Sequence, residues 1–151
     1  MGNNSSSEKP KNCIASFDKY FVSNDEIEHC YGGKIIGNTY FGMINYKNKN
    51  SYYGHWKIIK DQVVLDGSNG VMTFNDGTVY DGSWEAGKYH GHGRMDLYTK
   101  ASYEGEWSNG KRHGKGIMIY EDGTVINDEW VNGICKKRIK DHYHDYDPNL
   151  Y

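Results

Sequence analysis

The stretch YDGSWEAGKYHGHG, residues 80–93, decides the fold, because residues 103–116 repeat it as YEGEWSNGKRHGKG. Both copies open with the phrase aromatic-x-Gly-x-Trp, and all four tryptophans of the chain occupy the last position of this phrase or of a variant of it. The phrase and its variant begin at Tyr52, Tyr80, Tyr103 and Ile126. The last three starts lie 23 residues apart, which is a period typical of repeat arrays.

The phrase predicts a β-strand with two rings and a gap on one surface, because residues i, i+2 and i+4 of a strand share a face. A turn follows each tryptophan, and Asn109-Gly110 is the strongest short signal for a hairpin. A second turn, such as Asp122-Gly123, closes the unit. We therefore predict an all-β fold: an elongated single-layer antiparallel meander of about five β-hairpins.

The spacing also sets the domain boundaries. Units are expected to start near Tyr31, Tyr52, Tyr80, Tyr103 and Ile126, in an array that covers residues 31–137. Residues 1–30 are expected to form a flexible N-terminal tether with a short capping segment, and residues 138–151 a C-terminal tail. From Trp56 to Gly70 the chain is about five residues longer than the period requires, and an insertion of this kind usually forms a loop on one edge.

The units at residues 80–93 and 103–116 resemble the MORN repeat (membrane occupation and recognition nexus). The unit at Tyr52 is also similar, whereas the first lacks the tryptophan and the last has Asp128 in place of glycine. MORN arrays in other proteins are commonly adaptor or tethering segments, often linked to phosphoinositides. The resemblance therefore implies a non-catalytic scaffold that binds partner proteins and tethers them to a membrane, a cytoskeletal structure or a cilium.

Composition narrows the classes of function. A chain of 151 residues has no room for this array and a separate enzyme domain. A formal charge of −2 gives no general attraction to nucleic acid. Three widely spaced cysteines fit a reducing compartment, so we expect a cytoplasmic protein. Because no catalytic, cofactor or metal motif is present, we expect neither an enzyme nor a bound cofactor or metal.

Two surfaces are candidates for binding. The rings would line a groove for an extended peptide or a helix of a partner, unless they only pack against each other; they are Tyr52, Trp56, Tyr80, Trp84, Tyr103, Trp107 and Trp130. The turns that follow the tryptophans would place a row of cations on one edge, for anionic lipid headgroups or as protection against strand addition. This row is Lys88, Lys111, Arg112, Lys136 and Lys137.

The N-terminus carries a candidate membrane signal. Gly2 begins a myristoylation pattern with Ser6 in the required place. One acyl chain binds membranes only marginally, and Cys13 is a candidate for palmitoylation as the second signal. Two alternatives to the scaffold stay open: a module that binds anionic phospholipid directly, and a non-catalytic subunit of an enzyme or axonemal complex. The sequence leaves the oligomeric state open.

Overall fold

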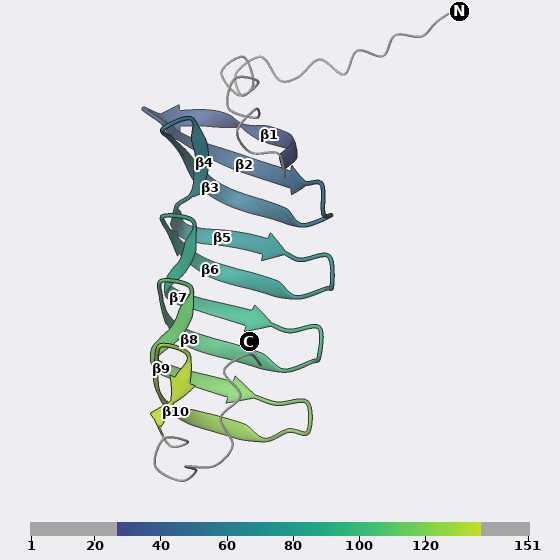
Figure 1. The fold of residues 1–151 in the computed structure, drawn as a ribbon, viewed down its shortest axis with the longest axis vertical. Helices are drawn as coiled ribbons and strands as arrows, with labels where there is room; N and C mark the ends of the chain where they lie inside the picture. Colours follow the sequence, from purple (N-terminus) through teal and green to yellow (C-terminus); the bar gives the residue numbers. More distant parts are fainter. Residues whose placement is uncertain (1–26, 137–151) are drawn as a thin grey trace, which may run out of the picture.

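The structure is a computed structural model that describes residues 27–136. Eleven antiparallel strands form one open sheet, stacked along the long axis of the molecule (Figure 1). The strands are β1 (Ile27–Ile36), β2 (Thr39–Tyr46), β3 (Ser51–Ile59), β4 (Gln62–Leu65), β5 (Gly67–Thr73), β6 (Val79–Glu85), β7 (Lys88–Asp96), β8 (Ser102–Ser108), β9 (Lys111–Ile119), β10 (Val125–Val131) and β11 (Ile134–Cys135). The predicted fold class is confirmed.

The strands follow each other in chain order, except that β4 leaves the main path and pairs only with β3. β1 begins four residues before the expected start of the array at Tyr31. The physical reason is that Ile27 and Cys30 are buried in the core, so the chain before Tyr31 already belongs to the sheet. The other residues of the predicted tether, the tail and the candidates Gly2, Cys13 and Lys137 lie outside the described residues.

The turns that follow the tryptophans are tight and two residues long. Asn109 and Gly110 have φ values of 51° and 81°, and Ala86 and Gly87 have φ values of 50° and 78°. Positive φ at both central positions matches the right-handed twist of the flanking strands, as the Asn-Gly signal predicts. These hairpin ends, which we call the tips, bend over one face of the sheet (Figure 1).

A second glycine produces this bend in the units that begin at Tyr80 and Tyr103. The register of β6 and β7 shifts between Gly82 and Trp84, next to Gly91, whose φ is 62°. The same shift occurs between β8 and β9, next to Gly114 with a φ of 56°. A bulge with glycine in the left-handed region bends and twists a hairpin. The tip is thereby turned over the indole of its own unit, and we call the covered face the inner face.

The insertion after Trp56 forms regular structure, which corrects the expected loop. Trp56 pairs with Leu65, nine residues later, whereas Trp84 pairs with Tyr89, five residues later. Four of the inserted residues therefore lengthen the hairpin of β3 and β4 by two residue pairs. The tip of this hairpin, Lys60-Asp61, again has positive φ at both residues. The fifth inserted residue lies between Leu65 and Gly70, where strand β5 begins.

Candidate functional site

The repeated rings form a continuous ladder inside the molecule. The Tyr–Trp contacts along the array from Tyr52 to Trp130 are edge to face, with centroids 5.3 Å apart for Tyr80 and Trp84 and 5.4 Å apart for Tyr80 and Trp107. Tyr40 and Trp56, at the start of the array, are stacked instead. Tyr80 thus contacts the indole of its own unit and that of the next unit. The Nε1 of Trp107 donates a hydrogen bond of 3.0 Å to the carbonyl of Gly93, in the preceding unit. Trp84 and Trp130 make the equivalent bonds to Gly70 and Gly116.

All seven rings of the predicted partner-binding face are buried, with exposed fractions between 0% and 6%. Rings at this depth pack mainly against each other, and of the seven only Trp84 also lines a hollow of the inner face. The expectation of an open aromatic groove made by these side chains is therefore corrected. The reason is the bend at Gly91 and Gly114, which places the tips over the indoles.

The hydroxyls of Tyr52, Tyr80 and Tyr103 each donate a hydrogen bond within their own unit. The hydroxyl of Tyr80 donates to the carbonyl of Ser83 at 2.9 Å, and that of Tyr103 donates to the carbonyl of Glu106 at 3.0 Å. Burial raises the pKa of Tyr80 and of Tyr52. Burial raises the pKa of Tyr89 and of Tyr103 to about 12. The phenols of the ladder are thus held in their neutral form.

We predict that these four tyrosines ionise later than the exposed ones in an alkaline titration. An unfolded phenol has a pKa of about 10. Because the folded pKa is raised, the neutral phenols stabilise the fold fully below about pH 10. This stabilisation is lost as the pH rises through about 12 for Tyr89 and Tyr103, and at still higher pH for Tyr52 and Tyr80. Ultraviolet absorbance of phenolate should show two stages, the second coinciding with unfolding by circular dichroism. A single stage near the unfolded value would contradict this prediction. Tyr103→Phe should make the second stage smaller.

The residue that pairs with each tryptophan forms the cover of the ladder. Along the chain these residues are Leu65, Tyr89, Arg112 and Cys135. Neighbouring tips are joined by hydrogen bonds: Gly87 N–H donates to the carbonyl of Leu65 at 2.9 Å, and Gly110 N–H to that of Tyr89 at 2.9 Å. Gly133 N–H donates to the carbonyl of Arg112 at 2.8 Å. The cover is therefore as periodic as the sheet beneath it.

The predicted row of cations is only partly present on the exposed edge. Lys88 and Lys111 are exposed at equivalent positions of two tips. Arg112 instead lies half-buried on the inner face, with its guanidinium 4.3 Å from the ring centroid of Trp130 and donating to the carbonyl of Gly133 at 3.0 Å. Lys136 is exposed but forms an ion pair with Glu129. The assignment of Arg112 to the lipid edge is therefore corrected: cation–π contact with the ladder holds it inward.

A groove that the sequence analysis missed lies on the inner face, with a volume of about 480 Å³. Its lining residues come from β1, the end of β2 and the turn after it, strand β4, strand β5 and the residue after it, strand β6, and the tips of the next two hairpins. They are Ile27, Tyr46, Asn48, Asn50, Val63, Leu65, Met72, Phe74, Trp84, Gly87, Lys88, Tyr89 and Gly110. We call this space the inner groove.

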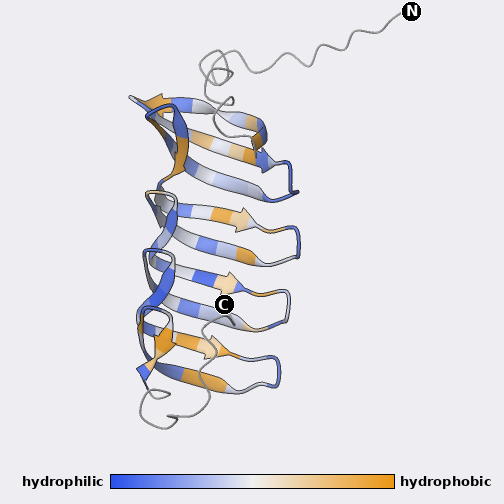
Figure 2. Cartoon of the chain, viewed as in Figure 1, coloured by the Kyte–Doolittle hydropathy of each residue, from blue (hydrophilic) through white to orange (hydrophobic). Residues whose placement is uncertain are grey.

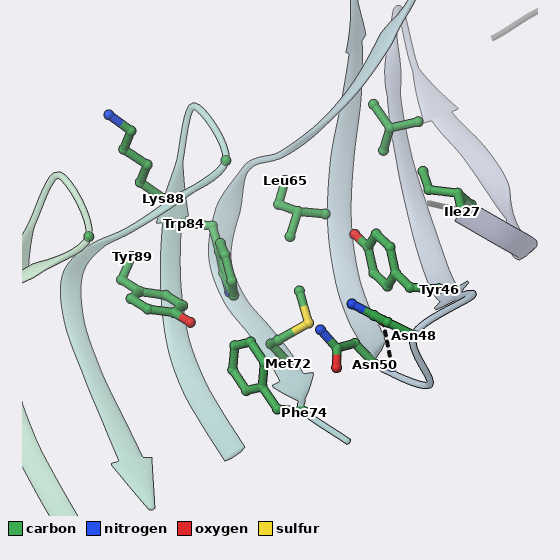
Figure 3. A pocket seen from close by; sticks show the side chains of 13 residues that line it. Ile27, Tyr46, Asn48, Asn50, Leu65, Met72, Phe74, Trp84, Lys88 and Tyr89 are labelled. Atoms are coloured by element: carbon green, nitrogen blue, oxygen red, sulfur yellow. Dashed lines mark hydrogen bonds between the residues drawn. The ribbon is translucent and has the colours of Figure 1, made fainter. Parts of the chain in front are cut away.

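The inner groove is apolar where it is deepest. In Figure 3 the side chains of Leu65, Met72 and Tyr46 point toward a common space, and Phe74 closes it from below. The single charged lining residue is Lys88, whose ammonium group points away from the hollow. On the polar rim, Asn48 accepts a hydrogen bond from the backbone N–H of Asn50 at 3.0 Å (Figure 3). A volume of this size lies in the range of ligand sites.

The signal that could have located the groove is the break in the period. Val63 and Leu65 reach the groove because they lie on β4, the strand that the insertion creates. In the two later hairpins the corresponding segment is a continuous part of β7 or β9. The insertion after Trp56 is thus the place where the inner face is hollowed.

Within residues 27–136, no group of three or more His, Cys, Asp or Glu side chains is arranged to hold a metal ion. In the same part of the chain, no helix is long and apolar enough to cross a membrane. What the described residues do form is an open repeat sheet with a covered aromatic ladder and one apolar groove. This defines a class of protein: a β-repeat module that presents surfaces for binding.

Comparison with known families identifies the repeat. The sequence pattern of the MORN repeat matches residues 68–79, 80–99 and 103–125. The chain is a MORN repeat protein, as the resemblance of its units implies, and MORN repeats are generally protein- or lipid-interacting modules. A comparison of the chain with curated proteins gave no match.

Proposed function

We propose that the protein is a non-catalytic scaffold that holds an extended segment of a partner protein in the inner groove. The observation that carries this proposal is the apolar floor of the groove, formed by Leu65, Met72, Phe74 and Tyr46 at the break in the repeat. Apolar pockets beside polar backbone and amide groups suit an extended peptide, whose alternate side chains enter the pockets. Asn48 and Asn50 supply amide groups on the rim.

The charge pattern argues against a lipid headgroup as the occupant of the groove. A headgroup site needs several cations that converge on one point. Lys88 points away from the groove (Figure 3), and Arg112 is engaged with Trp130 and Gly133. The alternative role of the edge is a weaker, peripheral contact with anionic membranes, made by Lys88 and Lys111 on the tips. We propose that the bound partner tethers the protein to a membrane or cytoskeletal structure, and that the groove does not contact the membrane directly.

The test uses peptides selected from a displayed random library on the immobilised protein. We expect selected peptides to share apolar residues at alternate positions and to shift the methyl NMR signals of Val63, Leu65 and Met72. Phe74→Asp and Val63→Lys should each weaken binding at least about tenfold, because a charge then meets an apolar side chain in the groove. Tyr98→Asp is the matched control, since Tyr98 is 66% exposed in the turn after β7 and does not line the groove.

Two results would overturn the proposal. One is that selected peptides shift only Met43 and Ile117, which face away from the groove on the opposite side of the sheet. The other is that no peptide is selected, whereas vesicles of phosphatidylcholine with phosphatidylserine bind the wild-type protein. In that case Lys88→Glu and Lys111→Glu would abolish binding to the vesicles. Thermal unfolding of each variant, compared with the wild-type protein, excludes loss of binding through loss of the fold.

A further inference from the structure

Within residues 27–136, strand β1 is the edge strand at one end of the sheet. It pairs with β2 on one side, and none of the other strands in residues 27–136 pairs with its second side. Proteins generally blunt such edges with short strands, prolines or bulges. β1 is ten residues long and contains no proline, whereas β11 at the other end of the sheet has two residues. Its two register shifts lie near its ends and leave His29–Lys34 regular.

Apolar side chains are exposed along this edge. Tyr31 is 48% exposed, Ile35 is 56% exposed and Ile36 is 74% exposed. Tyr31 pairs with Met43, which in turn pairs with Tyr53, so an exposed apolar row crosses three strands on the face opposite the inner face. When such a row ends at the edge of a sheet, its side chains can pack against apolar side chains of a further strand that pairs with this edge.

The sequence of β1 is complementary to itself when a second copy runs antiparallel. If Tyr31 of one copy lies opposite Tyr31 of the other, Lys34 of the second copy faces Glu28, the bulge residue that directly precedes the regular stretch, and the two-fold axis generates this ion pair twice. His29 then lies opposite Gly33, where a methyl group on the glycine would meet nothing within 4 Å. The present partner of Glu28 is Lys49 at 3.8 Å, in an exposed pair that holds neither group firmly.

We propose that two copies of this chain pair through the open edges of β1, antiparallel and centred on Tyr31, into one continuous sheet. A two-fold contact of this type uses the same surface on both copies and closes after two. It places the apolar rows of Tyr31, Met43 and Tyr53 side by side across the axis. The inner grooves of the two copies stay open on their own faces, so the pairing does not depend on the function proposed above.

The test is a charge exchange between two variants of the full chain. Glu28→Lys and Lys34→Glu each bring like charges together across the axis in a homodimer, and each should raise the dissociation constant about tenfold. An equimolar mixture of the two variants restores opposite charges at both contacts. We therefore expect the mixture to form a one-to-one heterodimer about as tightly as the wild-type chain forms its homodimer, measured by sedimentation velocity and native mass spectrometry.

Lys100→Glu is the matched control, because it makes the same charge change in the turn after β7, a strand that does not pair with β1, and should leave the dissociation constant within about twofold. Hydrogen exchange gives a second measurement: amides of residues 27–36 should exchange more slowly as the concentration of wild-type protein rises. A chain that stays monomeric, or a dimer whose strength is the same in the single variants and in their mixture, would overturn the proposal.

Discussion

Trp107→Ala is expected to lower the free energy of unfolding by about 3–5 kcal/mol, the range for removing a large buried aromatic side chain. The indole is 6% exposed and meets Tyr80, Tyr103 and Tyr89 with ring centroids 5.4 Å, 5.1 Å and 5.3 Å away. Its removal opens a cavity between two units and also leaves the carbonyl of Gly93 without its indole donor. Urea unfolding followed by circular dichroism measures the change.

The control for this variant is Tyr98→Ala, an aromatic truncation at a side chain that is 66% exposed in a turn. It should change the free energy of unfolding by less than about 0.5 kcal/mol. A change equally small for Trp107→Ala would mean that the indole lies in solvent, and the ladder described above would then be wrong.

Gly116→Ala is expected to lower the free energy of unfolding by about 3 kcal/mol or more, because the added methyl group overpacks the ladder. Gly116 is buried opposite Gly105, and the ring of Tyr103 lies flat across the two glycines. A methyl group on Gly116 would lie 2.6 Å from Cε2 of Tyr103 and still closer to Cζ and the hydroxyl oxygen. Tyr103 has no room to withdraw, since Trp107 and Trp130 pack against it.

Gly33→Ala separates this steric effect from the general effect of replacing glycine in a strand. A methyl group on Gly33 meets nothing within 4 Å, and alanine in a strand is intrinsically better than glycine by about 0.5–1 kcal/mol. We expect this variant to be as stable as the wild-type chain or slightly more stable, in urea unfolding at low protein concentration. A comparable decrease in the free energy of unfolding for both variants would show that steric crowding over Gly116 is not the reason why glycine is needed at this position.

The repeated phrase allowed the sheet to be predicted from the sequence, because strand faces, turn residues and period are local properties. Tyr80, Gly82 and Trp84 share a face in the structure as the alternation requires, and Asn109-Gly110 forms the expected turn. The inward position of Arg112 could also have been predicted from the sequence. It lies 23 residues after Tyr89, so the repeat assigns it the inward position that Tyr89 occupies against Tyr80 at 4.1 Å.

The cover over the ladder and the inner groove could not be predicted in the same way. The cover depends on the left-handed conformation of Gly91 and Gly114, and a glycine in a sequence is compatible with many conformations. The groove depends on residues as far apart as Tyr46 and Gly110, which only the bent tips bring together. Figure 2 adds that hydropathy along the ribbon is uneven, with β9 and β10 more hydrophobic than β8, a difference that the period does not encode.

The hydrogen bonds between successive tips, from Gly87, Gly110 and Gly133 to the unit before, link each unit only to its neighbours. In such an arrangement stability is close to a sum over units and their contacts. A duplication or loss of one 23-residue segment among the later units therefore changes the length of the molecule without demanding any new kind of junction. The hairpin of β3 and β4 differs from the later units, because it carries the inserted residues, and its Val63 and Leu65 line the inner groove. Duplication or loss of such a segment would thus change the length of the sheet while the hairpin of β3 and β4 stays as it is.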